Sequence, residues 1–483
     1  MSRDSAFMRG WAWPVLAAGV LAGCQVGPDY ERPEDSALVP EAWSSGEQSE
    51  SEADIVRWWT RLDDPELTGL IDRAFESSLT LREAGERVIA ARARRGIRNA
   101  DRLPALDADA FYRRTVTGDE GLNFDGTPPG TSTDLYSLGA VAGWELDLWG
   151  RVSRLVEAAD AEIGFATEDF RASRVSLAAE IAREVVLIRA IDRDLELVES
   201  TIETDRDTLS IAEARAEAGF GDALDVVRAE RDLEADLALV PGLLADRREA
   251  ELRVGVLLGA VPGSVEVSRA SLPQGGGVPA LGVPADLLMR RPDLRRAERE
   301  LAAATARIGS AKAERFPRVT LSGSIALQGP DVDDVIDMDA YVLQAGPRIT
   351  LPLFEGGRIR SRVQQAESEQ RQAELRLRSA VLDALAEVET ASVRRARAEE
   401  RADRLLQAEA AARDAETLST DKFTAGQVDF LDVTEARRSR LGLERERVVA
   451  ERDTLLRLID LYTALGGGWD PEAAQPGRVA SSE

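Results

Sequence analysis

Pairs of carboxylates spaced three residues apart occur at two places in the chain. Asp222 and Asp225 lie in "AGFGDALDV", which begins at position 218, and Asp429 and Asp432 lie in "AGQVDFLDV", which begins at position 425. A carboxylate pair can act as general acid and base. Acids at this spacing after a glycine are also typical of a helix N-terminus, where N-cap and N3 side chains accept backbone N–H groups. We therefore expect these four aspartates to cap two helices.

The remaining composition argues against most catalytic chemistry. The chain has no histidine, which removes the usual general base at neutral pH and the usual zinc ligand. Lys and Arg total 61 against 87 Asp and Glu, a net charge of −26, so a polyanion such as nucleic acid would be repelled. A hydrolase would need a pocket with a nucleophile and a base, and without histidine it would have to use a Ser-Lys or paired-carboxylate device; we assign the aspartate pairs to helix caps and identify no such pocket. We expect no enzymatic activity, no cofactor and no metal site.

A single cysteine, Cys24, ends an apolar N-terminal segment. Arg3 and Arg9 precede the uncharged run 11–23, "WAWPVLAAGVLAG", which is too short to span a bilayer. The residues "LAGC" resemble the lipobox of bacterial lipoproteins, which implies a signal peptide over 1–23 and acylation of the Cys24 thiol, with an extension over 24–64. By the same resemblance, Gln25 in place of an aspartate implies sorting to the outer membrane.

The repeated stretch belongs to a tandem duplication. Its two copies are 207 residues apart, and the match continues to "LLGA" at position 257 over "ALGG" at position 464. Upstream, "ADRLPAL" at position 100 matches "AERFPRV" at position 313, and "ELDLWGR" at position 145 matches "TLPLFEGGR" at position 350 with a two-residue insertion. We expect repeats over 65–260 and 285–466, a Gly/Pro-rich linker over 261–284 and a tail over 467–483.

Each repeat alternates between two periodicities. Apolar residues at spacings of three, four and seven predict long coiled-coil helices, and the longest, about 65 residues, would extend roughly 100 Å. Gly219 and Gly426 would supply the left-handed turn at the hairpin tips, and Pro241 would kink the first returning helix. The predicted helices are 65–101, 152–217 and 223–258 in the first repeat, and 285–315, 358–420 and 430–465 in the second.

Four segments with a period of two predict strands over 107–116, 136–148, 319–328 and 341–353. One face of each is apolar and the other small or polar, the pattern of a transmembrane β-barrel wall. Four strands cannot close a barrel, and an open edge in lipid is costly. Three copies supplying twelve strands would make the simplest ring wide enough to conduct. The fold class is therefore mainly α with a small transmembrane β part, in a trimeric channel-tunnel with a long α-helical barrel. The acidic loop "DVDDVIDMD" lacks the spacing of a calcium loop.

Several long motifs resemble one family. They are "CQVGPDYERP", "RWWTRLDDPELTGLIDRA", "WELDLWGRV", "LLMRRPDLRRAERELAAATARIGSAKAERFPRVTLSG", "LPLFEGGRI" and "FTAGQVDFLDVTEARRS". They look like the NodT subgroup of outer-membrane efflux lipoproteins, in the TolC/OprM-like family, over nearly the whole mature chain. The resemblance implies a homotrimer in the outer membrane that extends into the periplasm and passively conducts small toxic compounds. Its implied partners are a periplasmic adaptor and an inner-membrane pump of the resistance-nodulation-division type.

The resemblance also implies roles for residues at the hairpin tips. Matching the family's resting constriction places Leu431 and Glu435 at a channel gate, with Asp429 and Asp432 beside them; this chain has Glu435 where the subgroup often has aspartate. The implied adaptor-contacting surface comprises Gly219, Asp222, Leu224, Asp225 and Gly426. Two alternatives stay open: a type I secretion conduit for polypeptides, and a lipid-anchored coiled-coil spacer, which would leave the four strands unexplained.

Overall fold

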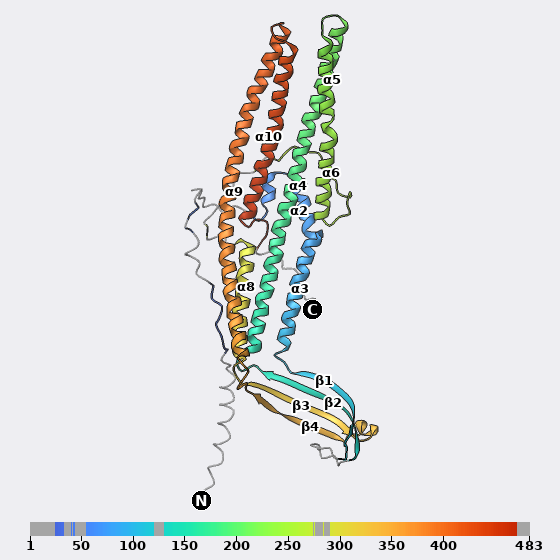
Figure 1. Cartoon of the computed structure of the whole chain (residues 1–483), viewed down its shortest axis with the longest axis vertical. Helices are drawn as coiled ribbons and strands as arrows, with labels where there is room; N and C mark the ends of the chain where they lie inside the picture. The colour runs from blue at the N-terminus through green and yellow to red at the C-terminus, as the bar shows by residue number, and fades with distance from the viewer. Residues whose placement is uncertain are drawn as a thin grey trace. The chain divides into compact units, whose positions relative to one another are not determined.

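The chain consists of two compact units, and each draws on both sequence repeats. The computed structural model describes residues 25–32, 40, 42–43, 55–119, 130–273, 275, 284 and 290–470. Unit 1 comprises 1–33, 89–165 and 297–377, and unit 2 comprises 34–88, 166–296 and 378–483. The repeats found in the sequence are therefore not separate compact bodies (Figure 1).

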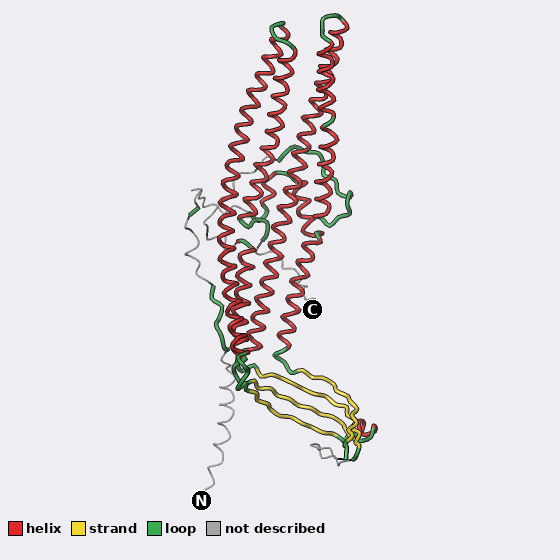
Figure 2. The backbone as a smooth tube through the Cα atoms, in the orientation of Figure 1, coloured by secondary structure: helices red, strands yellow, loops and turns green. Residues whose placement is uncertain are grey.

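Unit 1 contains a four-stranded antiparallel sheet in the order β1-β2-β3-β4 (Figure 2). The strands are β1 (Ala105–Val116), β2 (Ser132–Leu146), β3 (Arg318–Gly329) and β4 (Tyr341–Thr350). The first hairpin comes from the first repeat and the second from the second, and β2 pairs with β3 between them, with Leu138 opposite Leu327. β1 and β4 are left as the two edges.

The register places polar and apolar side chains on opposite faces of this sheet. Asp109 pairs with Gly139, Ser324 with Gln344 and Thr320 with Arg348 on one face. The neighbouring positions carry Leu138 opposite Leu327 and Trp144 opposite Leu321 on the other. This alternation follows from the two-residue period of the sequence.

β2 and β4 differ most from the predicted strands, whereas β1 begins two residues earlier than predicted and β3 is longer by one residue at each end. The strand predicted over 136–148 begins at Ser132 and ends at Leu146, because the Asp147 carboxylate turns the chain into a helix by accepting bonds from the backbone N–H groups of Val152 (2.9 Å) and Ser153 (2.7 Å). The strand predicted over 341–353 ends at Thr350, two residues before Pro352, which has no N–H to donate.

The helices include two of 67 residues, α4 (Arg151–Glu217) and α9 (Arg358–Thr424). Each is followed by a tight turn and a returning helix (Figure 1). The remaining described helices are α2 (Pro65–Ser77), α3 (Leu79–Ala100), α5 (Ala223–Leu237), α6 (Leu239–Leu257), α8 (Pro292–Ala313) and α10 (Phe430–Ala464), with the short 3₁₀ helices η2 (Trp58–Leu62) and η4 (Val332–Ile336).

Three helix predictions are corrected. The single helix predicted over 65–101 is broken at Ser78, whose ψ of 128° is not helical. The helix predicted over 223–258 is broken at Ala238; Pro241 has no N–H for the carbonyl of Leu237, four residues back, where α5 ends. The helix predicted over 285–315 is α8, which begins at Pro292; residues 285–289 lie outside the described part of the chain.

The core of unit 2 includes residues that we expected to lie in an extension and a tail. Trp58 stacks on Tyr462 with ring centroids 5.3 Å apart, and both are fully buried. Trp469 is buried as well, and the guanidinium of Arg171 lies 4.6 Å from its ring centroid. The backbone N–H of Gly468 donates to the Ile55 carbonyl (3.0 Å). Segments on both sides of the repeats therefore help to close this core.

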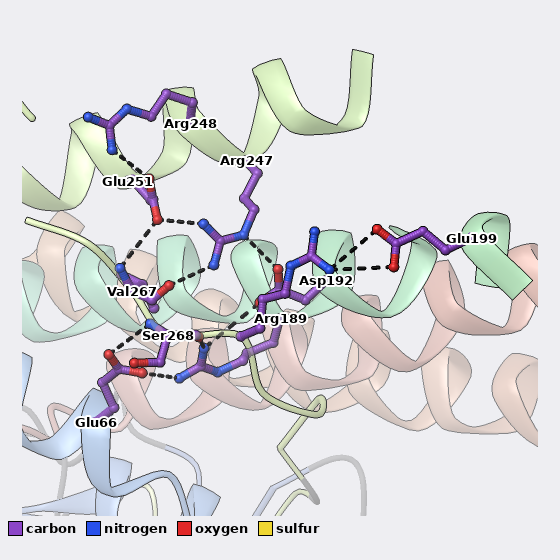
Figure 3. A network of polar contacts seen from close by, with 10 residues as sticks. Glu66, Arg189, Asp192, Glu199, Arg247, Arg248, Glu251, Val267 and Ser268 are labelled. Atoms are coloured by element: carbon purple, nitrogen blue, oxygen red, sulfur yellow. Dashed lines mark hydrogen bonds and ion pairs between the residues drawn. The ribbon is translucent and has the colours of Figure 1, made fainter. Parts of the chain in front are cut away.

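A buried ionic network holds part of the predicted linker 261–284 in unit 2 (Figure 3). Arg189 of α4 bonds to Asp64 Oδ2 (3.1 Å), to Glu66 Oε2 (2.7 Å) and to the carbonyl of Ser268. Arg247 of α6 bonds to Asp192 Oδ1 (2.6 Å) and to the carbonyl of Val267 (2.6 Å). Because Arg189 and Asp192 are buried, each charge depends on its partners.

Candidate functional site

The turns that join α4 to α5 and α9 to α10 close in the same way. Gly219 has φ of +76° and Gly426 has φ of +71°, the left-handed conformation that glycine adopts without strain. In both turns the next amide reaches back five residues. Phe220 N bonds to Arg215 O and Gln427 N to Lys422 O, each at 2.9 Å. This is a Schellman ending, so the repeated glycines of the sequence produce two equivalent tips.

The four aspartates of these tips lie at helix starts, but their hydrogen bonds differ. The Asp222 carboxylate accepts a bond from the backbone N–H of Leu224 (3.0 Å). In the second tip, Asp432 Oδ2 accepts one from the backbone N–H of Asp429 (3.1 Å), as part of a capping box. Asp225 lies in the first turn of α5, 3.7 Å from Arg228. These contacts account for the aspartates as caps.

The second tip presents an apolar side chain and an acid on the same helix face. Leu431 and Glu435 are both exposed and lie one turn apart on α10. The 207-residue repeat offset makes Leu224 the counterpart of Leu431, and Leu224 is also exposed. The counterpart of Glu435 is Arg228, so the charge at this position is reversed between the tips.

Behind the tips, arginines of α10 connect the two helical hairpins. Arg437 donates to Thr208 Oγ1 of α4 (2.9 Å) and to Glu416 Oε1 of α9 (3.3 Å). Arg438 donates to Asp232 Oδ1 of α5 (2.9 Å). The bonds to Thr208 and Asp232 join residues more than 200 positions apart in the sequence.

Arg437 and Asp205 line a cavity of about 250 Å³ together with Asp232, Asp236 and Phe430. Burial, together with the neighbouring Asp236 carboxyl, raises the pKa of the Asp205 carboxyl to about 6, against the opposing effect of Arg437. Arg437 lies 3.8 Å from Asp205 Oδ1. The site therefore contains a carboxyl group that titrates near neutral pH at the junction of the hairpins.

Nine of the ten candidate residues chosen from the sequence lie in the part of the chain that the structure describes. The structure sets five of them around the turn of the second hairpin and four around that of the first, while Cys24 lies outside the described residues. Sequence reasoning missed Asp205 and Arg437. Both follow the ordinary helical pattern, and only tertiary packing brings them together.

The described part of the chain shows neither a cluster of metal-binding side chains nor a membrane-spanning helix. It contains no group of three or more Cys, Asp or Glu side chains arranged to hold a metal ion. No described helix combines the length and the apolar character needed to cross a membrane.

Comparison with known proteins identifies the class. The family profile described as outer membrane efflux protein matches residues 70–260 and again 283–467. Nodulation protein T of Rhizobium leguminosarum bv. trifolii is 33% identical over 94% of this chain and 96% of its own length. The toluene efflux pump outer membrane protein TtgI of Pseudomonas putida is 31% identical over 94% and 98%. The outer-membrane channel OprN has a solved structure that matches with a TM-score of 0.83 at 32% identity, covering 93% of this chain and all of that one.

The chain belongs to the outer membrane efflux protein family. Its fold is that of a trimeric channel-tunnel, and it acts as an outer-membrane channel for efflux. The double match of the family profile also confirms the tandem duplication seen in the sequence.

Proposed function

We propose that this chain forms the passive outer-membrane conduit of a tripartite efflux system, with its hairpin tips docking on a periplasmic adaptor above an inner-membrane pump of the resistance-nodulation-division type. The observation that carries the proposal is the pair of equivalent tips, which expose apolar side chains at Leu224 and Leu431. Exposed apolar side chains beside turn glycines suit contact with another protein's helical hairpin. The conduit performs no chemistry, and the pump supplies the energy.

The cargo that we propose is small and toxic. TtgI, a relative that matches along nearly its whole length, is named for toluene efflux, which supports small compounds over polypeptides. Uptake of a small fluorescent dye by cells that lack the gene, with and without a plasmid copy, would test this. Equal dye accumulation in both strains, with normal secretion lost in the deletion, would favour the polypeptide conduit instead.

We propose that Leu431 and Glu435 close the resting pore. In a trimer, three leucines would form an apolar constriction that disfavours water, and three glutamates would add a ring of negative charge. Asp429 and Asp432 would hold the start of α10 in place through the capping box. Adaptor docking would then open the pore by separating the helical hairpins.

Single-channel conductance of the purified trimer in a planar bilayer tests the gate. The Leu431→Ala, Glu435→Ala variant should conduct several-fold more than wild type because both rings are removed. Its matched control is Leu224→Ala, Arg228→Ala at the equivalent positions of the first tip, which should leave conductance near the wild-type value. Equal conductance of wild type and the Leu431/Glu435 variant would refute the gate assignment.

The proposed adaptor surface comprises Gly219, Asp222, Leu224, Asp225 and Gly426. Its support is that a Cβ added at Gly219 or Gly426 would meet no atom of the described residues within 4 Å, so each turn has room for a partner. A Gly426→Asn variant tolerates the left-handed turn and adds bulk. It should weaken cross-linking to the adaptor while the trimer persists, whereas joint loss of trimer and cross-link would assign the glycine to folding alone.

We also propose that Cys24 carries the lipid anchor. Gln25, the first described residue, lies against Gly150 in unit 1, so the chain just after Cys24 is held in place. Mass spectrometry of the mature N-terminus should find an acylated cysteine, and an unmodified Cys24 would refute the proposal.

A further inference from the structure

The loop after β4 exposes two large apolar side chains in unit 1. Leu353 is 89% exposed and Phe354 is 90% exposed. Two adjacent large apolar side chains exposed to this degree indicate a contact made outside this chain.

The equivalent loop of the first repeat makes its contact within the chain. The motif "ELDLWGR" matches "TLPLFEGGR", which makes Trp149 the counterpart of Phe354. Trp149 stacks on Phe316, with ring centroids 4.8 Å apart and planes at 23°, and its Nε1 donates to the carbonyl of Pro317 (2.8 Å). An aromatic residue at this loop position therefore has a defined packing position, formed by Phe316 and Pro317 of the second repeat.

The equivalent packing position in the first repeat is largely exposed in the described structure. The motif "ADRLPAL" matches "AERFPRV", so Leu103 and Pro104 are the counterparts of Phe316 and Pro317. Leu103 is 64% exposed. Among the described residues, the aromatic side chain of this loop motif is therefore packed within the chain at Trp149 and exposed at Phe354, and the packing position at Leu103 is exposed as well.

We propose that Phe354 of one protomer packs on the neighbouring protomer's Leu103 and Pro104, so that the subunit interface repeats the contact that joins the two halves of a single chain. The proposal rests on the trimeric fold and specifies how its copies meet. Around the trimer, contacts within a chain, Trp149 with Phe316, would then alternate with equivalent contacts between chains, Phe354 with Leu103.

A pair of equivalent glycines supports the same arrangement. Gly309 of α8 lies against α4, and a Cβ added there would come within 2.8 Å of Arg154 Cδ. At the offset of 213 residues between "ADRLPAL" and "AERFPRV", its counterpart is Gly96 of α3, where an added Cβ would meet no described atom within 4 Å. If α3 packs on the neighbouring protomer's α9 as α8 packs on α4, Gly96 would face Ser361, the counterpart of Arg154, and two small residues there would let the helices approach closely.

The edge strands β4 and β1 carry opposite charges at matching positions if neighbouring protomers pair them in the way that β2 pairs with β3 within one chain. β3 corresponds to β1 at an offset of 213 residues, and β4 corresponds to β2 at an offset of 205 residues. Within the chain, Gly143 of β2 pairs with Ser322 of β3. The equivalent pair between chains is Arg348 of β4 opposite the neighbouring protomer's Asp109 of β1. If the offset between β2 and β4 is taken from the registers of the two hairpins, it is 207 residues, and Arg348 then lies diagonally across from Asp109. In either register the opposite charges share the polar face and attract each other.

Cross-linking between two chains that each carry one introduced cysteine tests the contact. Leu103→Cys and Phe354→Cys are introduced into separately tagged copies, which are co-expressed, purified as trimers and treated with a short bismaleimide. Because each chain carries only one introduced thiol, a linked species that contains both tags must join two protomers. We expect such dimers from the co-expressed pair, and none from either variant expressed alone, which also controls for reaction at Cys24.

The matched control is Trp149→Cys, Phe316→Cys in one chain, which should link internally without changing the chain's mass on a denaturing gel. Absence of the Leu103–Phe354 link in trimers whose internal control does link would overturn the proposed contact while leaving the trimeric channel intact. A wild-type protein that is not trimeric by native mass spectrometry would overturn both.

A steric test gives a second result. Gly96→Leu should reduce the trimer fraction by roughly tenfold or more, because the leucine side chain would separate two helices that the proposal places in close contact. Gly69→Leu in α2, where an added Cβ also meets nothing within 4 Å, makes the same chemical change elsewhere and should assemble normally. Leucine favours a helix more than glycine, so a weakened helix cannot explain the loss. Normal assembly of Gly96→Leu would overturn the proposal.

Discussion

Replacing Arg437 with methionine should make the two helical hairpins separate more readily. Arg437 donates to Thr208 Oγ1 of α4 at 2.9 Å and lies 3.8 Å from Asp205 Oδ1, so it joins the second hairpin to the first. Its bond to Glu416 stays within the second hairpin and survives separation. Methionine keeps much of the side-chain volume and removes the charge.

The magnitude follows from these contacts. A hydrogen bond from a charged donor contributes about 1.5 to 3 kcal/mol. Because 23% of the Arg437 side chain is exposed, we take the lower limit. A loss of about 1.5 kcal/mol shifts the equilibrium between joined and separated hairpins by about 12-fold.

Channel recordings and hydrogen exchange can measure this shift. Open probability of the Arg437→Met trimer should rise about 12-fold if opening requires the hairpins to separate, and amide protection around Thr208 should fall. The matched control is Arg438→Met, which removes a bond to Asp232 from a side chain that is 61% exposed and should have a much smaller effect. Equal behaviour of the two variants, or no change in Arg437→Met, would refute the reasoning.

Two further predictions concern buried charges. The pKa of Asp205 is raised from 3.8 to about 6, so its charged form destabilises the hairpin junction above pH 6, and this penalty is relieved as pH falls from about 6 to 3.8. Amide protection at the junction should therefore rise over that pH range in the wild type. A flat profile in the wild type, or the same rise in the Asp205→Asn variant, would contradict the assignment. Arg189→Met should lower the free energy of unfolding by about 3 to 5 kcal/mol, because it removes the ionic partner of the buried Asp64 carboxylate and of Glu66, while Asp192 keeps its bond to Arg247. The exposed pair of Arg397 with Glu400 should contribute about 0 to 1 kcal/mol in an Arg397→Met control, and denaturant unfolding that ranks the two variants equally would be inconsistent with the network around Arg189 in Figure 3.

Much of the fold could be predicted because its determinants are local or repeated. Gly219 and Gly426 indicate the hairpin turns from sequence alone, since few other residues adopt a left-handed backbone without strain. The two-residue alternation in the strands sets which side chains share a face, and the motifs around Trp149 and Phe354 reveal the duplication. The cap positions follow from the chemistry of aspartate beside free N–H groups.

Other features depend on contacts that no local pattern contains. The break at Ser78 accompanies a bond from Ser77 Oγ to the carbonyl of Leu258, which lies 181 positions away in the sequence. The pKa of Asp205 depends on Asp236 and Arg437, which approach it only after the hairpins pack.

The sequence by itself determined the periodicities, the turns and the duplication of this protein, because these arise from backbone sterics and from the spacing of side chains along one segment. Tertiary structure alone decided which of two equivalent residues is packed and which is exposed. Trp149 has Phe316 within the same chain, while Phe354 is exposed, since four strands leave one edge of each repeat without a partner in the chain.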